Sequence, residues 1–152
     1  MAVTMTHSIE IARPPGEVYA YITQPWRWHE WHPSSRSASE HQGPLGVGDA
    51  FDEVIEVQPL APLPLTLRRD VHYRVLDAVP GSVWQVRGEY RDGWLSIRYE
   101  LEPTPRGTRF ARTLTFDARG PTRSLVPLLA SRQAVVSVRA LQGLRDRLER
   151  AG

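Results

Sequence analysis

The chain contains no cysteine and no lysine, and it has no long apolar run. Without cysteine there can be no disulfide, thiol nucleophile or thiolate metal ligand. The longest apolar stretch, residues 125–130, is far shorter than the roughly 20 residues that span a bilayer, so we expect no stable membrane insertion. No basic segment followed by an apolar one opens the chain, which favours a cytoplasmic protein over a secreted one.

All 19 basic residues are arginines, and 17 acidic residues leave a net charge of only +2. The arginines are scattered along the chain with acids between them, whereas a nucleic-acid-binding protein gathers them on one face. The composition therefore argues against a nucleic-acid partner. Arginine tolerates burial and bidentate pairing better than lysine, so arginines inside apolar strands are candidates for a binding site.

The 152 residues suit a single domain, 1–152, with no repeat or linker. Stretches of alternating apolar and polar residues, separated by Pro, Gly and Asp, predict strands joined by short turns, which is the pattern of an antiparallel meander. Asp92-Gly93 is a strong hairpin signal within it. The expected strands are 3–12, 49–57, 65–76, 83–91, 94–102 and 108–117.

Helical signals flank the strands. Pro14 and Pro15 open a short helix that Pro25 ends, because proline fits only the first helical turn. Residues 26–31 indicate a second short helical piece, and residues 34–48 a polar loop. From residue 124 to 150 the period is helical, which predicts a terminal helix of about seven turns. Its expected apolar stripe is Ala134, Val135, Val138, Leu141, Leu144 and Leu148.

Three segments together resemble one known family. Residues 7–19 (HSIEIARPPGEVY), 24–33 (QPWRWHEWHP) and 138–144 (VRALQGL) are similar to START-like (SRPBCC) proteins of the polyketide cyclase/dehydrase and lipid-transport group. The resemblance implies an α+β helix-grip fold, in which a curved antiparallel sheet of about seven strands wraps around a long C-terminal helix, with two short helices after the first strand. It also implies a ligand cavity between sheet and helix. A fold by itself assigns no activity.

Three ionisable residues share strand parity with apolar neighbours and are therefore expected on the inner face: Glu53, Arg69 and Arg112. A loop centred on Ala61 would place Glu53 opposite Arg69, close enough to pair. In the functional interpretation Arg112, with or without Arg69, holds a carbonyl, carboxylate or enolate of the ligand. In the alternative, Glu53 and Arg69 satisfy each other and Arg112 extends its head to solvent.

A hairpin turn at Asp92-Gly93 would set Val86 opposite Tyr99 and Trp84 opposite Leu101. Parity, the aromatic segment 26–31 and the apolar stripe of the terminal helix together predict 15 residues that line the cavity implied by the resemblance. They are Trp28, Trp31, Phe51, Glu53, Arg69, Val71, Tyr73, Trp84, Val86, Ile97, Tyr99, Phe110, Arg112, Val138 and Leu141.

Three functions are compatible with these residues. The first is a binding protein for a small hydrophobic or amphipathic ligand such as a lipid, a polyketide or an isoprenoid-like molecule. The second is a polyketide cyclase or aromatase, with Arg112, Tyr99, Tyr73 and His29 as candidates for charge stabilisation and proton transfer. The third is a protein-interaction module of the chaperone-cofactor type, and a monomer or a homodimer would suit any of them.

We expect no cofactor and no metal. The two imidazoles of His29-x-x-His32 lack a clear third ligand, and zinc sites use at least three protein ligands. No nucleophile motif and no glycine-rich phosphate loop is present.

Overall fold

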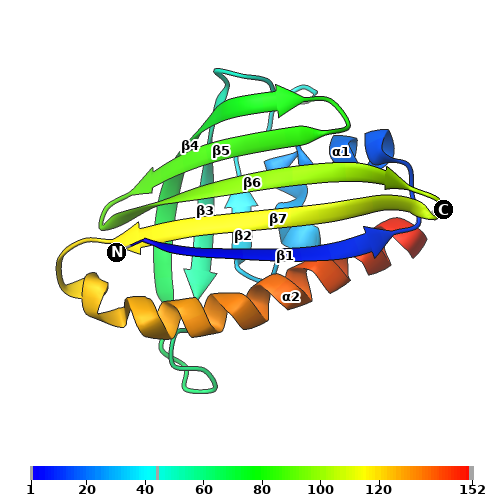
Figure 1. The fold of residues 1–152 in the computed structure, drawn as a ribbon. Coiled ribbons are helices and arrows are strands. Elements are labelled where there is room, and N and C mark those ends of the chain that lie inside the picture. The colour runs from blue at the N-terminus through cyan, green and yellow to red at the C-terminus, as the bar shows by residue number, and fades with distance from the viewer. Residues whose placement is uncertain (1, 44, 151–152) are drawn as a thin grey trace.

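The computed structural model describes residues 2–43 and 45–150. Seven antiparallel strands form one strongly curved sheet, and a long helix lies in the grip of its concave side (Figure 1). The strand order is β1-β7-β6-β5-β4-β3-β2. The strands are β1 (Val3–Ile11), β2 (Ser35–Ala38), β3 (Ala50–Val57), β4 (Leu67–Val79), β5 (Val83–Tyr90), β6 (Gly93–Thr104) and β7 (Gly107–Ala118).

Two short helices follow β1, and two more elements end the chain. They are α1 (Pro15–Ile22) and the 3-10 helix η1 (Pro25–Glu30), then the 3-10 helix η2 (Gly120–Leu125) and α2 (Val126–Arg150). α2 runs alongside β1, and η1 contacts β2 at the other edge of the sheet. This arrangement confirms the predicted helix-grip fold.

Two element predictions need correction. The polar loop expected at 34–48 contains the strand β2, which at four residues is too short to show an alternating pattern. The terminal helix expected from residue 124 starts as α2 at Val126, because residues 120–125 form the tighter 3-10 turn η2. Pro127 then stands in the first turn of α2, where it breaks no hydrogen bond.

The predicted strand registers are both displaced by two residues. Glu53 pairs with Val71 instead of Arg69, because the connection between β3 and β4 is centred one residue later than assumed. Trp84 pairs with Tyr99 instead of Leu101, because the hairpin turns at Arg91-Asp92 and Gly93 already belongs to β6.

Gly93 is needed for packing in the strand. A Cβ atom there would clash with the carbonyl oxygen of Asp117 on the neighbouring strand. The two-residue error in the predicted registers leaves every side chain on its predicted face of the sheet, so the inward assignments hold.

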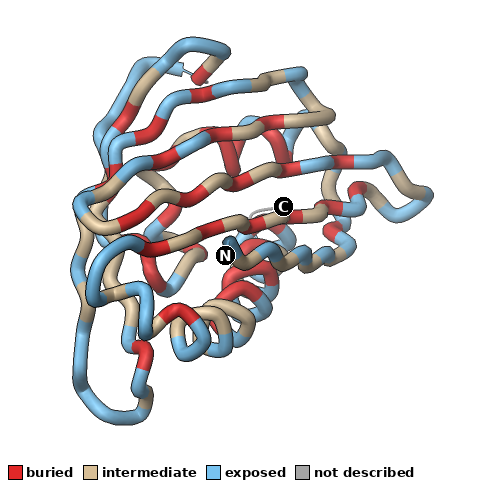
Figure 2. The backbone as a smooth tube through the Cα atoms, turned by 60° about the vertical axis from the view of Figure 1, so that its left-hand side comes forward, coloured by how far each residue is buried: buried red, intermediate tan, exposed pale blue. Residues whose placement is uncertain are grey.

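Buried residues recur at every second position along the strands (Figure 2). They converge on an aromatic block in the middle of the fold, in which the Trp28 ring stands edge-on to its neighbours. Its indole N–H donates to the Ile22 carbonyl at 2.8 Å, which ties η1 to α1. The block consists of Trp28, Phe51, Tyr73, Trp84, Tyr99 and Phe110.

Candidate functional site

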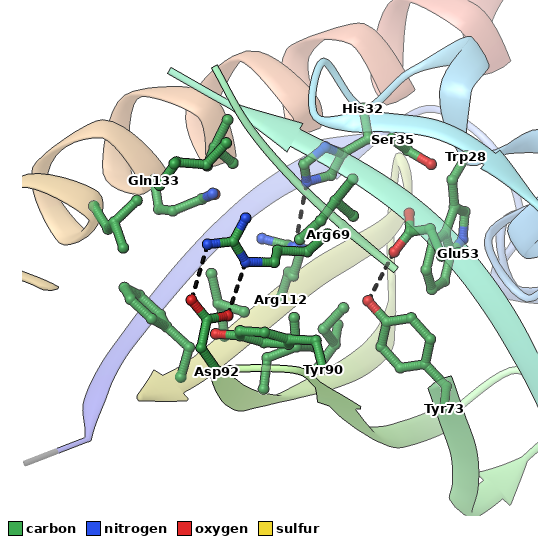
Figure 3. Close-up of a pocket in the computed structure, with 18 of the residues that line it drawn as sticks. Trp28, His32, Ser35, Glu53, Arg69, Tyr73, Tyr90, Asp92, Arg112 and Gln133 are labelled. Carbon is green, nitrogen blue, oxygen red and sulfur yellow. Dashed lines mark hydrogen bonds and ion pairs between the residues drawn. The ribbon is translucent and has the colours of Figure 1, made fainter. Parts of the chain in front are cut away.

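A cavity of about 90 Å³ lies between the concave face of the sheet and the first half of α2 (Figure 3). Apolar atoms form most of the wall surface, although eleven of the 20 lining residues carry a polar group. The apolar lining comprises Trp28, Ile55, Val57, Leu67, Leu95, Ile97, Leu114, Phe116 and Leu129, and the polar lining comprises His32, Ser35, Glu53, Arg69, Tyr73, Tyr90, Asp92, Tyr99, Arg112, Thr122 and Gln133.

The aromatic block closes one end of this cavity. Trp28, Tyr73 and Tyr99 belong both to the block and to the cavity wall. Behind them Phe51 and Trp84 stack on Tyr73 and Tyr99, with ring centroids 4.7 Å and 5.5 Å apart. Part of the space between sheet and helices is therefore solid aromatic core, and the free volume lies towards the turn between β5 and β6.

Arg112 projects from β7 into the cavity wall and is only 5% exposed. Its Nη1 donates to Ser137 Oγ of α2 at 3.1 Å, and its Nη2 lies 3.3 Å from His32 Nε2. Its Nε–H is buried and has no hydrogen-bond partner. Among the described residues no carboxylate lies within ion-pair distance of this guanidinium, which leaves a buried cation without a direct counter-ion.

Glu53 of β3 is 4% exposed and accepts a hydrogen bond from the Tyr73 hydroxyl at 2.7 Å. Burial raises the pKa of Glu53 to about 7, although Ser35, Tyr73 and the charge of Arg112 favour its ionised form. The same burial, together with the Glu53 charge, raises the pKa of Tyr73 well above 10. The cavity wall therefore holds a carboxyl group that changes charge near neutral pH.

His32 follows η1 and lines the cavity. Its Nδ1 accepts the backbone N–H of Ser34 at 3.1 Å. Burial and the nearby charge of Arg112 hold the pKa of His32 well below its ordinary 6.5, so the ring is neutral at physiological pH.

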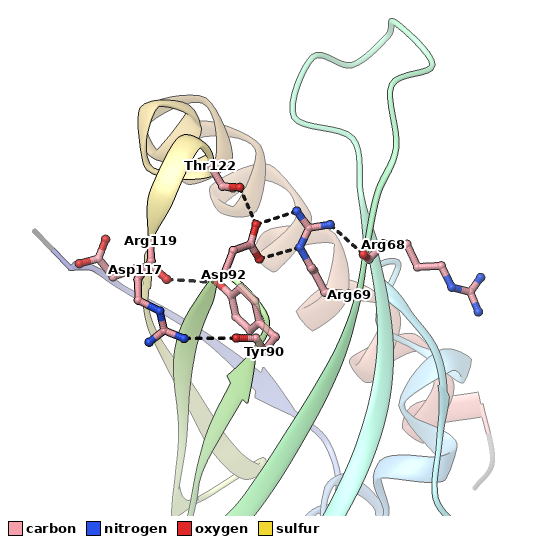
Figure 4. A network of polar contacts seen from close by, with 7 residues as sticks. All are labelled: Arg68, Arg69, Tyr90, Asp92, Asp117, Arg119 and Thr122. Atoms are coloured by element: carbon pink, nitrogen blue, oxygen red, sulfur yellow. Dashed lines mark hydrogen bonds and ion pairs between the residues drawn. The ribbon is translucent and has the colours of Figure 1, made fainter.

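An ion pair lines the other end of the cavity, and Figure 4 shows its contacts. Arg69 of β4 donates from Nε and Nη2 to the two carboxylate oxygens of Asp92, both at 2.8 Å. The Thr122 hydroxyl of η2 donates to the same carboxylate. These hydrogen bonds lower the pKa of Asp92 to about 2 and join three separate segments at the cavity mouth.

Seven of the 15 predicted cavity residues form part of the wall: Trp28, Glu53, Arg69, Tyr73, Ile97, Tyr99 and Arg112. Seven others are buried behind it in the core: Trp31, Phe51, Val71, Trp84, Val86, Phe110 and Leu141.

The remaining prediction, Val138, is 44% exposed and does not line the cavity. Of the four catalytic candidates, His29 is exposed and does not line the cavity either, whereas Tyr73, Tyr99 and Arg112 do. The predicted pair of Glu53 with Arg69 is wrong, because Arg69 binds Asp92 and Glu53 binds Tyr73.

Sequence reasoning missed three polar residues that matter here. Asp92 gave only a turn signal, and Ser137 lay outside the expected apolar stripe of the helix. His32 was considered only together with His29 as an incomplete metal pair, but η1 ends at Glu30, and His32 lines the cavity whereas His29 is exposed. Of the three, only Ser137 could have been found from the sequence, because a helical projection places it on the face of α2 that packs against the sheet, where it can meet the buried Arg112.

The likeness to solved structures extends over the whole chain. The aromatase/cyclase Zhui from Streptomyces sp. R1128 superposes with a TM-score of 0.76 at 14% identity, over 99% of this chain and 95% of that one. The protein TTHA0849 from Thermus thermophilus gives 0.73 at 18% identity, over 100% and 99%. Ara h 8.0201 gives 0.62 at 10% identity, over 97% of each chain. At such identities the likeness shows the fold alone.

No curated protein has a matching sequence. None of the helices among residues 2–43 and 45–150 is long and apolar enough to cross a membrane. The model of one sequence family matches residues 2–149, which is nearly the whole chain. The chain thus belongs to the polyketide cyclase / dehydrase and lipid transport family.

Proposed function

We propose that the protein binds a small hydrophobic or amphipathic molecule in the cavity between the sheet and α2. The observation that carries this proposal is a mainly apolar cavity with a buried, incompletely hydrogen-bonded Arg112 in its wall. Lipid, polyketide and isoprenoid-like molecules combine an apolar body with a few polar atoms. The apolar surface of the cavity can hold such a body, and its polar side chains can bind the polar atoms. Family membership supports the same conclusion.

The size of the cavity limits the part of the ligand that can be enclosed. A volume of about 90 Å³ is smaller than the roughly 150 Å³ of an engineered apolar cavity that takes up benzene. A short chain therefore fits without rearrangement, whereas a ring needs more room than the closed cavity provides. A larger lipid would require the Arg69–Asp92–Thr122 contacts to open.

The test is native mass spectrometry of the freshly purified protein, followed by extraction and identification of any bound molecule. Leu114→Trp fills the cavity, and Leu76→Trp is the matched control because Leu76 lies on β4 outside the cavity and is 49% exposed. We expect bound molecules in the wild type and in the control but not in the filled variant. Equal loading of the two variants, both folded, would refute cavity binding.

A cyclase or aromatase is the second candidate. What favours it is the convergence of polar groups from five different segments on one cavity, namely His32, Glu53, Tyr73, Tyr99 and Arg112. Such groups can orient a flexible polyketone and stabilise an enolate. Turnover of a linear poly-β-ketone, lost in Arg112→Met and retained in the exposed-site variant Arg139→Met, would establish this activity, and absence of turnover would leave the carrier function.

The third candidate, an interaction module, has less support, because such a module needs no internal cavity and this fold has one.

A further inference from the structure

The imidazole of His32 has a hydrogen-bond donor at each of its two nitrogens. The backbone N–H of Ser34 points to Nδ1 at 3.1 Å, and Nη2 of Arg112 lies 3.3 Å from Nε2. A neutral imidazole has one acceptor nitrogen and one N–H. It can therefore satisfy only one of the two donors.

The local geometry selects the tautomer. Ser34 is two residues from His32, so its contact with Nδ1 is held by the short intervening chain, whereas Arg112 has a flexible side chain. With Nδ1 accepting from Ser34, the proton is on Nε2. The Nε2–H group and the Nη2–H group of Arg112 then face each other as two donors at the cavity wall, an arrangement that needs an acceptor between them.

Arg112 has the same unmet need. It is buried, its Nε–H has no partner, and no described carboxylate pairs with it. An oxygen atom that accepts from both Nη2 and Nε2 at about 2.8–3.0 Å fits over two nitrogens that are 3.3 Å apart. Both residues line the cavity, so a ligand can supply that oxygen.

We propose, as a deepening of the ligand-binding function proposed above, that the cavity selects ligands bearing a carboxylate, whose oxygens accept hydrogen bonds from Arg112 and from His32 Nε2–H. A single cation matches a monoanion, and a dianion such as a phosphate monoester would leave one charge unbalanced in an apolar wall. The apolar remainder of the cavity then holds a short chain.

Glu53 makes this binding dependent on pH. The groups that face it are Tyr73 from β4, Ser35 from β2, Tyr99 from β6 and Arg112 from β7. Arg112 is the only cation among them, so an ionised Glu53 and a ligand carboxylate compete for the same charge. Glu53 therefore takes up a proton when the carboxylate binds, and binding is tighter at about pH 6 than at about pH 8.

The test compares short-chain ligands that differ only in the polar head, hexanoate and 1-hexanol, by titration calorimetry at about pH 6. We expect the wild type to bind hexanoate at least about tenfold more tightly than 1-hexanol. Arg112→Met should abolish that preference and change alcohol affinity by less than about threefold. Arg139→Met is the control, because Arg139 is exposed on α2 and should leave both affinities unchanged.

Glu53→Gln provides a second test that keeps Arg112 in place. It should leave the preference for carboxylates intact and remove the loss of affinity between about pH 6 and about pH 8. Binding of 1-hexanol to the wild type as tightly as hexanoate would overturn the carboxylate proposal and leave ligand binding standing. If neither hexanoate nor 1-hexanol binds, the carboxylate proposal is overturned, and the broader ligand-binding function is then decided by the native mass spectrometry described above.

Discussion

Glu53→Gln should change how the stability of the protein depends on pH. In the folded protein the pKa of Glu53 is raised from its ordinary 4.5 to about 7, mainly by burial. Between these two values the unfolded chain releases the proton and the folded protein keeps it. Folding stability is therefore highest below pH 4.5 for this group and falls as the pH rises towards 7.

The size of the effect follows from the two pKa values. Between about pH 5 and about pH 8, the shift from 4.5 to about 7 lowers the free energy of unfolding by about 2.5 kcal/mol. Glutamine is nearly isosteric, keeps an oxygen to accept the Tyr73 hydroxyl at the same place, and does not titrate. In a chain of this length about 2.5 kcal/mol corresponds to roughly 5–10 °C in Tm.

The wild-type curve alone would hide this effect. His32 has the opposite sign, because its pKa is lowered on folding and its neutral form costs stability as the pH falls below 6.5. The quantity to measure is therefore the difference in Tm between wild type and Glu53→Gln at each pH, with His32 common to both proteins. We expect Glu53→Gln to gain about 5–10 °C on the wild type from about pH 5 to about pH 8. A constant difference would refute the raised pKa of Glu53.

Two further substitutions test the cavity mouth and the helix packing. Asp92→Asn should lower the free energy of unfolding, measured in urea at neutral pH, by about 1–2 kcal/mol. Because the pKa of Asp92 is about 2 in the folded protein, this difference from wild type should shrink as the pH falls from about 4 to about 2. A pH-independent difference would contradict its charged pairing with Arg69. Gly143→Ala should lower Tm although alanine favours helix, because its Cβ would lie 2.9 Å from the Trp31 carbonyl oxygen. Gly16→Ala in α1 is the control: its Cβ would meet nothing within 4 Å, so this substitution should be neutral or stabilising. Equal effects of the two substitutions on Tm would contradict the close approach of Gly143 to Trp31.

Much of the fold followed from periodicity in the sequence. Phe51, Tyr73 and Phe110 were assigned inward by alternation alone and are at most 2% exposed. This assignment tolerates a register error of two residues because the side-chain period of a strand is two. Which residues pair was predicted wrongly, because pairing depends on where the chain turns.

The polar contacts of the site were harder to predict than its faces. Arg69 and Asp92 are 23 residues apart, and they meet because the antiparallel register of β4 and β5, in which His72 faces Glu89, sets Arg69 opposite Asp92 just beyond the end of β5. This register shifts between Val75 and Asp77, and no local pattern encodes that shift. The helix α2 gave a related error: Val135 and Val138 are each 44% exposed, while Ala140 and Ser137 are buried. Hydrophobicity favoured the valines, but close packing against the strands selects the smaller side chains.

The aromatic block has a consequence for ligand length. Because Trp28, Tyr73 and Tyr99 are backed by further stacked rings, this end of the cavity is a rigid floor that cannot recede to admit a longer guest. In a homologous series of ligands each added methylene must extend towards Asp92 and Thr122. The distance from the aromatic rings to these two residues therefore limits the length of the ligand that the closed cavity can hold.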